Sequence, residues 1–176
     1  MLKKILGVVA LLLALLLVFA TTRPDTFRVE RSATIKAPPD KVFAYLNDFQ
    51  KFGAWSPWEK LDPAMQRTFS GTATGPGSVY AWTGNDKVGA GRMEIKSVEP
   101  NAKVTIQLDF FKPFEAHNTT DYILKAGADG TTTVTWAMSG PMPYISKLMG
   151  VFVSMDSMIG KDFEQGLANL KAVAEK

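Results

Sequence analysis

The chain has 176 residues, of which 46% are hydrophobic and 21% charged, and it contains no cysteine and a single histidine. This length suits one domain with a substantial apolar core, and the composition excludes a disordered chain, a disulfide scaffold, a zinc–thiolate site and a cysteine nucleophile. The formal charge of +3 falls to about +1 without residues 1–22, whose charged side chains are Lys3 and Lys4. Nucleic-acid binding requires clustered basic side chains, and this nearly balanced charge gives no sign of them, so we expect no nucleic-acid partner.

An unbroken apolar run over residues 5–20 follows these two lysines. Two interpretations stay open: an uncleaved signal-anchor helix, or a signal peptide cleaved after Val18-Phe-Ala20, in which case the mature protein is secreted. In both interpretations the lysines stay in the cytoplasm and the remainder lies on the extracytoplasmic side. We therefore divide the chain into an N-terminal membrane or signal segment, residues 1–22, and one domain, residues 23–176.

The domain is predicted to begin with a strand followed by two short helical segments. Residues 27–35 alternate between apolar and polar side chains, as a strand does, and Ala37-Pro-Pro-Asp40 ends the alternation. Asp40 is placed to cap the first helical segment. The apolar positions of the two helical segments are Val42, Phe43, Leu46, Phe49, Phe52 and Trp55.

A hydrophobic period close to two predicts an antiparallel meander in the middle of the chain. The six strands are expected over residues 65–71, 77–83, 88–99, 102–112, 115–126 and 130–139, with turns rich in Gly, Pro and Asn between them. After Gly140-Pro-Met-Pro143 the period changes to 3.6, which predicts one amphipathic helix to the C-terminus, about 45 Å long. Its apolar stripe comprises Ile145, Leu148, Met149, Phe152, Met155, Ile159, Phe163, Leu167, Leu170 and Val173.

Several local motifs accompany this order of elements. They are Val29–Ile35 with Ala37–Phe43, Phe52–Trp58 with Leu61–Pro63, Gly89–Ile95, Thr133–Trp136 and Met155–Lys171. Together they resemble the START-like (SRPBCC) superfamily, and in particular the bacterial polyketide cyclase/dehydrase-like proteins, over residues 26–175. The resemblance implies an α+β helix-grip (Bet v 1-like) fold, in which a curved seven-stranded antiparallel sheet wraps around a long C-terminal helix, and a pocket for an apolar ligand. Members of the superfamily range from carriers to enzymes, so the resemblance is more informative about the fold than about the function. A bacterial source makes the extracytoplasmic side the periplasm.

The more apolar phase of each strand predicts which side chains face the space between sheet and helix. These candidate ligand-binding residues include no carboxylate, lysine or histidine, which suits a small hydrophobic or amphipathic ligand, lipid-like or aromatic, better than acid–base catalysis. The same pattern is also that of an ordinary core rich in methionine. We expect no catalytic residue, metal or cofactor. The candidates are Tyr80, Trp82, Met93, Ile106, Leu108, Phe110, Asn118, Thr120, Tyr122, Trp136, Met138, Met149, Phe152, Met155 and Ile159.

Other motifs favour structural interpretations. His117 falls on the outward phase of its strand, as Glu94 and Asp109 do on theirs, so all three are expected at the surface. The glycine-rich segments 71–77 and 84–91 lack the lysine and the helix that follow in a phosphate-binding loop, so they are expected to be turns. In Trp55-Ser-Pro-Trp58, the two indoles either close the pocket mouth or pin the helical segment onto the sheet, and we favour the second.

Three hypotheses for the function follow. The first is a monomeric, membrane-tethered protein that binds a small apolar ligand. The second is a cyclase or dehydratase-like enzyme acting on an aromatic or polyketide-type substrate through Tyr80, Tyr122 or His117. The third is an interaction module with a filled core. A cavity below about 300 Å³ would favour the third hypothesis, and ionisable groups pointing into the cavity would count against the first.

Overall fold

A computed structural model describes residues 1–176. Its centre is one seven-stranded antiparallel sheet in the order β1-β7-β6-β5-β4-β3-β2. The meander that the sequence predicts is therefore present, and β1 closes it by pairing with β7. The strands are β1 (Thr26–Ile35), β2 (Gln66–Gly71), β3 (Ser78–Thr83), β4 (Ala90–Glu99), β5 (Lys103–Lys112), β6 (Ala116–Ala126) and β7 (Thr132–Pro141).

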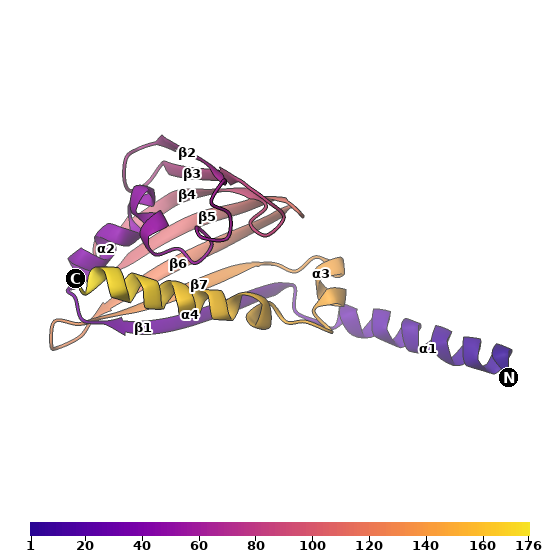
Figure 1. The fold of residues 1–176 in the computed structure, drawn as a ribbon. Helices are drawn as coiled ribbons and strands as arrows, with labels where there is room; N and C mark the ends of the chain where they lie inside the picture. The colour runs from indigo at the N-terminus through magenta and orange to yellow at the C-terminus, as the bar shows by residue number, and fades with distance from the viewer.

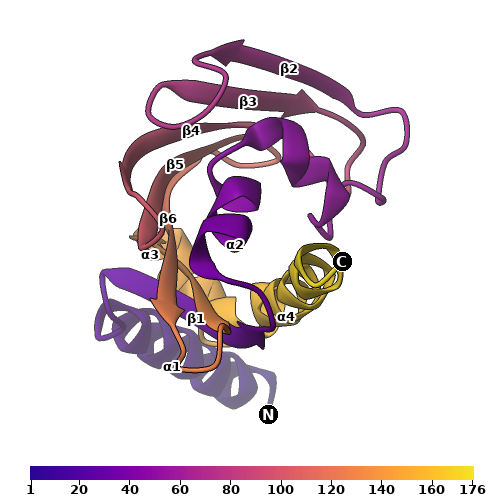
Figure 2. The same ribbon diagram turned by 90° about the vertical axis from the view of Figure 1, so that its left-hand side faces the viewer.

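The helices lie in two separate places. The helices α2 (Pro39–Leu46), η1 (Phe49–Ala54) and α4 (Met155–Ala174) cover the concave face of the sheet, which curves over them (Figure 2). The helices α1 (Leu2–Thr21) and α3 (Tyr144–Met149) lie together at one end, and α1 projects from the domain there (Figure 1). This arrangement is the helix-grip α+β fold, with an additional apolar N-terminal helix.

The prediction of one continuous C-terminal helix is wrong. The helix α3 ends at Met149, and α4 begins only at Met155, where the Ser154 side chain caps it by accepting a hydrogen bond from the Ser157 amide at 3.1 Å. Gly150 is a poor helix former and Ser154 is a good N-cap, so both favour a break here. The helix α4 is therefore about 30 Å long rather than 45 Å.

The start of α2 also differs from its prediction. Asp40 does not cap this helix, because the N-cap position is Pro38 and no side chain makes a capping hydrogen bond. Pro39 occupies the first helical position, where the fixed φ angle of proline fits and its missing N–H costs nothing. Asp40 lies within the first turn, where a negative charge interacts favourably with the helix dipole.

Aromatic side chains join the sheet, η1 and α4 into one core. Trp55 is 1% exposed and meets Tyr122 and Trp136 edge-on, with ring centroids 5.7 and 5.6 Å apart. Its carbonyl oxygen accepts a hydrogen bond of 3.0 Å from the Asn169 amide group on α4. Trp55 therefore pins the end of η1 between sheet and helix, so the prediction of pinning is confirmed for this one of the two indoles. Trp58 is only partly buried, and its ring packs against Trp136 and Phe163.

Candidate functional site

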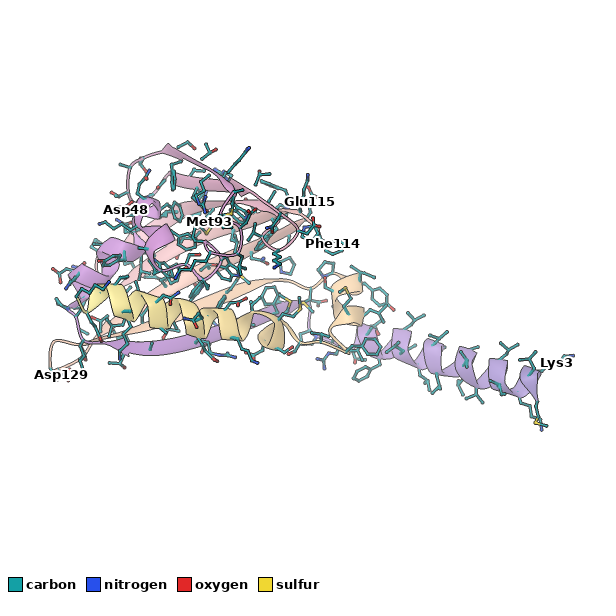
Figure 3. All side chains as sticks on the ribbon, viewed as in Figure 1. Lys3, Asp48, Met93, Phe114, Glu115 and Asp129 are labelled. Atoms are coloured by element: carbon teal, nitrogen blue, oxygen red, sulfur yellow. The ribbon has the colours of Figure 1, made fainter.

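A cavity of about 250 Å³ lies between the concave face of the sheet, η1 with its following loop, and α4. Of its 18 lining residues, 14 are hydrophobic. Met93, which is labelled in Figure 3, lies in this interior space. The lining residues are Phe52, Ser56, Trp58, Glu59, Met65, Tyr80, Trp82, Lys87, Val88, Met93, Leu108, Phe110, Thr120, Tyr122, Trp136, Met138, Ile159 and Phe163.

Two groups of strands form the walls of the cavity. On β3, β4 and β5, Met93 lies opposite Tyr80 on one side and Leu108 on the other, so the three side chains share one face. On β6 and β7, Thr120 lies opposite Met138 and Tyr122 lies opposite Trp136.

The helix α4 forms the wall of the cavity opposite the sheet. Its Phe163 ring stacks on Trp136 with centroids 4.2 Å apart and an angle of 8° between the rings, and Ile159 lines the cavity one turn earlier. Most of the cavity wall is therefore built on regular elements.

Most of the candidate ligand-binding residues from the strands border this cavity. Those that do are Tyr80, Trp82, Met93, Leu108, Phe110, Thr120, Tyr122, Trp136 and Met138, together with Ile159 from α4. Whether any of them binds a ligand stays a prediction.

Five candidates lie elsewhere. Ile106 belongs to the packed core, and Asn118 lies against the backbone of Gly140. Met155 packs partly buried at the start of α4. Met149 and Phe152 are 58% and 73% exposed, because the break between α3 and α4 directs their segment away from the sheet. The assignment of these two side chains to the interior is therefore wrong.

The loops supply lining residues that strand alternation could not identify. Ser56, Trp58, Glu59 and Met65 come from the segment between η1 and β2, and Lys87 comes from the β3–β4 turn. The expectation that the cavity wall contains no carboxylate and no lysine is therefore wrong, and these two ionisable groups count against the first hypothesis. A period of two or 3.6 residues carries no information about side-chain direction in irregular segments. Of these positions, only Trp58 carried a sequence signal, as one of two indoles that could close the pocket mouth.

The carboxylate of Glu59 is fully paired. Tyr80 Oη donates to Glu59 Oε1 at 2.6 Å, and Arg67 Nε donates to Glu59 Oε2 at 2.6 Å. Burial, followed by the bond to Glu59, raises the pKa of Tyr80, and the bond to Glu59 raises the pKa of Arg67. Tyr80 therefore stays neutral at physiological pH, and the positive charge of Arg67 compensates the carboxylate.

Three other polar groups at the cavity wall have no partner in the protein. Ser56 Oγ and Trp136 Nε1 are buried without a hydrogen bond. The Tyr122 hydroxyl also makes no hydrogen bond to the protein, and burial alone raises its pKa well above 10. An indole N–H is a donor only, whereas the two hydroxyls donate or accept. Because Ser56 Oγ and Trp136 Nε1 are covered by protein atoms, the Tyr122 hydroxyl is the group of these three that can donate to an uncharged acceptor atom of a ligand.

His117 lies on the outer face of the sheet, opposite Asp109. Its side chain is 65% exposed, and Nδ1 lies 2.8 Å from Asp109 Oδ1. Burial opposes the ionisation of Asp109, but hydrogen bonds from His117 and Gln107 outweigh it and lower the pKa of this carboxyl. Glu94 is on the outer face too, where it pairs with Arg92 at 2.6 Å. These three residues are directed away from the cavity.

Solved structures of other proteins share this fold. The Aha1 dimer from Colwellia psychrerythraea superposes with a TM-score of 0.61 at 18% identity, covering 85% of this chain and 96% of that one. Protein CV1439 from Chromobacterium violaceum gives 0.58 at 15% identity, covering 88% and 99%. Ara h 8.0201 gives 0.57 at 15% identity, covering 85% and 97%. No curated protein matches the chain in sequence.

The family assignment comes from the sequence of the domain itself. The family model described as "Polyketide cyclase / dehydrase and lipid transport" matches residues 26–175, which span every strand of the sheet and all helices except α1. The match agrees with the helix-grip fold and with the cavity between the sheet and α4. The chain therefore belongs to the polyketide cyclase / dehydrase and lipid transport family.

Proposed function

We propose that this protein binds a compact, uncharged hydrophobic or amphipathic ligand in the cavity, while α1 tethers it to the membrane. The observation that carries the proposal is a partly open apolar cavity whose wall is built mostly on regular elements and whose one carboxylate is compensated. Apolar walls with a few fixed polar groups are typical of small-molecule sites. The family and the fold support a ligand-binding cavity in general terms.

The size of the cavity narrows the class of ligand. A volume of about 250 Å³ equals that of about eight water molecules in the liquid, and it exceeds the roughly 150 Å³ of a cavity known to accept benzene. It lies below the roughly 300 Å³ at which drug-sized pockets begin. The volume alone thus favours the interaction-module hypothesis over a carrier of whole lipids. The cavity is nevertheless large enough for a ligand with one or two rings.

The charges at the cavity wall favour a neutral ligand. Glu59 is already bonded to Arg67 and Tyr80. Lys87, the other charged lining residue, is exposed in the β3–β4 turn, so no unpaired buried charge is present to compensate an ionised guest. Burying an unpaired charge is costly, whereas burying a carbonyl or hydroxyl group is not once a donor reaches it. The Tyr122 hydroxyl supplies such a donor. An aromatic ketone or phenol is therefore the chemical class that fits best.

The tether rests on α1. It is the one helix of the structure that is long and apolar enough to cross a membrane, with 20 residues and a mean hydropathy of 2.6. Twenty residues of helix measure about 30 Å, which is the thickness of the hydrocarbon core. Lys3 and Lys4 favour an orientation with the N-terminus in the cytoplasm and the domain in the periplasm.

A cyclase or dehydratase-like enzyme is the second candidate. The short hydrogen bond between Tyr80 and Glu59 beside the cavity favours it, because a phenol and a carboxylate are the groups that acid–base chemistry uses. In this arrangement both carboxylate oxygens are occupied and Tyr80 holds its proton tightly. Binding without turnover therefore fits the geometry better.

Native mass spectrometry of the full chain in detergent, with two matched tryptophan variants, tests the proposal. Thr120→Trp fills the cavity, whereas Thr119→Trp places the same side chain on the outer face of the same strand. We expect a small neutral ligand to be retained by the wild type and by Thr119→Trp and to be lost from Thr120→Trp, with all three proteins folded by circular dichroism. A wild type that is always empty, or a ligand retained by Thr120→Trp, contradicts the proposal.

A further inference from the structure

Large apolar side chains are exposed at the end of the domain where α1 emerges. In α3 and the turn after it, Ile145, Met149, Phe152 and Val153 are 63%, 58%, 73% and 52% exposed. In the hairpin between β5 and β6, Phe111 and Phe114 are 50% and 77% exposed. We call these six residues the anchor-side surface. Monomeric soluble proteins rarely expose so many large apolar groups together.

The helix α3 is attached directly to the apolar helix α1. Tyr144 Oη donates to the carbonyl oxygen of Leu17 at 3.0 Å, and the Lys147 ammonium group pairs with Asp25 just after α1. The hairpin lies at the same end of the sheet, where Phe114 is labelled in Figure 3, whereas Asp129 lies at the opposite end. Both parts of the anchor-side surface therefore lie at the end of the domain from which α1 projects (Figure 1).

These contacts determine the depth of α3 relative to a membrane that α1 spans. Leu17 lies inside the apolar run 5–20, three residues before its end at Ala20. At a rise of 1.5 Å per residue, the bond from Tyr144 therefore reaches a level about 4.5 Å below the end of that run. If α1 fills the hydrocarbon core, then α3 is held at the boundary between acyl chains and headgroups.

The composition of the two segments fits that boundary. Residues 141–155 carry one charged side chain, Lys147, which is paired with Asp25 and only 11% exposed. The hairpin presents Lys112 between two phenylalanines and one acidic residue, Glu115, after them. A lysine at this depth extends its ammonium group to the headgroups. Aromatic and aliphatic residues with sparse positive charge are typical of segments in the membrane interface.

We propose that the anchor-side surface is seated in the lipid bilayer interface, with Phe114 and Phe152 among the lipids. This inference rests on the proposed tether and adds an orientation to it. A soluble protein partner is disfavoured as the occupant, because it would have to enter the headgroup layer beside α1. Phe110 lines the cavity and is followed directly by Phe111 of the surface. The hairpin thus connects the cavity wall to the bilayer, which gives a membrane-soluble ligand a short path.

Spin labelling tests this placement directly, because the chain has no native cysteine. Single variants Val9→Cys, Phe114→Cys, Phe152→Cys and Asp129→Cys of the full chain are labelled with a nitroxide in vesicles of phosphatidylcholine and phosphatidylglycerol (3:1). Relaxation by oxygen, which concentrates in lipid, is compared with relaxation by a water-soluble nickel complex. All four positions are exposed in the structure, so the labels do not disturb the core.

The expected order of burial in lipid is Val9 deepest, Phe114 and Phe152 intermediate with oxygen favoured over nickel, and Asp129 fully in water. A deep Val9 label together with Phe114 and Phe152 labels as accessible to nickel as Asp129 would overturn the placement and leave the tether intact. A Val9 label in water would overturn the tether itself and, with it, the placement.

Discussion

Two glycines of α4 provide a matched test of how tightly the helix closes the cavity. A Cβ atom at Gly166 would lie 2.5 Å from Trp136 Cζ3 and 3.2 Å from Pro57 Cδ. Trp136 is 3% exposed and stacked on Phe163, so it has no free space into which to move. A Cβ atom at Gly160 would lie 2.2 Å from Arg31 Nη2. This guanidinium group is paired with Asp156 and Glu164, each at 2.7 Å, so it can shift only by weakening these ion pairs.

Replacing either glycine by alanine changes the stability of the protein through helix propensity and through packing, and only the packing contribution differs between the two sites. Each gains about 1 kcal/mol of helix propensity. Overpacking against a ring that cannot move costs about 1–3 kcal/mol, and this cost applies to Gly166→Ala. Gly160→Ala instead weakens the partly exposed ion pairs of Arg31, and such pairs contribute little to stability. We therefore expect Gly166→Ala to be destabilised by about 0–2 kcal/mol and Gly160→Ala to be as stable as the wild type or more stable.

Thermal unfolding of the full chain in detergent, followed by circular dichroism, measures this difference. For a protein of this size, 1 kcal/mol corresponds to about 2–4 °C in Tm, so Gly166→Ala is expected to melt at least about 2 °C below Gly160→Ala. Equal Tm values, or a higher value for Gly166→Ala, would refute the reasoning, because α4 would then not be packed against Trp136 as described.

Three further predictions concern the polar groups. Tyr122→Phe is expected to weaken the binding of acetophenone about fivefold to tenfold in NMR titrations, because a hydrogen-bond donor worth about 1 kcal/mol is lost. The binding of α-methylstyrene, the isosteric hydrocarbon, is expected to stay unchanged. Equal losses of affinity for both probes would refute a hydrogen bond from Tyr122 to the ligand. The pKa values of Tyr80 and Tyr122 are raised in the folded state, so the unfolded chain loses these two protons at a lower pH than the folded chain does. The stability of the fold is therefore expected to be full below about pH 10 and to fall as the pH rises further. A Tm that stays constant from pH 9 to pH 11 contradicts this expectation, and absorbance at 295 nm reports the ionisation of tyrosine. His117→Gln removes a side chain on the outer face, so acetophenone affinity is expected to stay within twofold of the wild type, whereas a large loss would place His117 at the site after all.

Alternation predicted the sheet part of the site well because both faces of each strand differ in polarity. Met93, Thr120 and Tyr122 could be assigned to the inner face, and His117 to the outer one, from their positions alone. For each strand, it was enough to decide whether the odd-numbered or the even-numbered residues face inward. Pairing through Gly and Asn turns then determined which residues became neighbours.

The helix and loop parts could not be predicted in this way. The 3.6-residue period continues through Met149 and Phe152, because α3 is also amphipathic, but its apolar side faces away from the sheet beside α1. Periodicity thus identifies an apolar face without identifying what covers it. Glu59 lies in an irregular loop, and only the folded chain brings it to Tyr80 and Arg67.

The distribution of methionines permits the most direct test of a guest in the cavity. Met65, Met93 and Met138 line it, whereas Met149 and Met158 are 58% and 55% exposed. In the full chain labelled with ¹³C at the methionine methyl groups, titration with acetophenone is expected to shift the signals of the three lining methionines saturably, with one common Kd at or below about 1 mM. The signals of Met149 and Met158 are expected to stay in place. Lining signals that do not move, or that move linearly together with the exposed ones, would contradict the claim that the space between the sheet and α4 accepts a ligand.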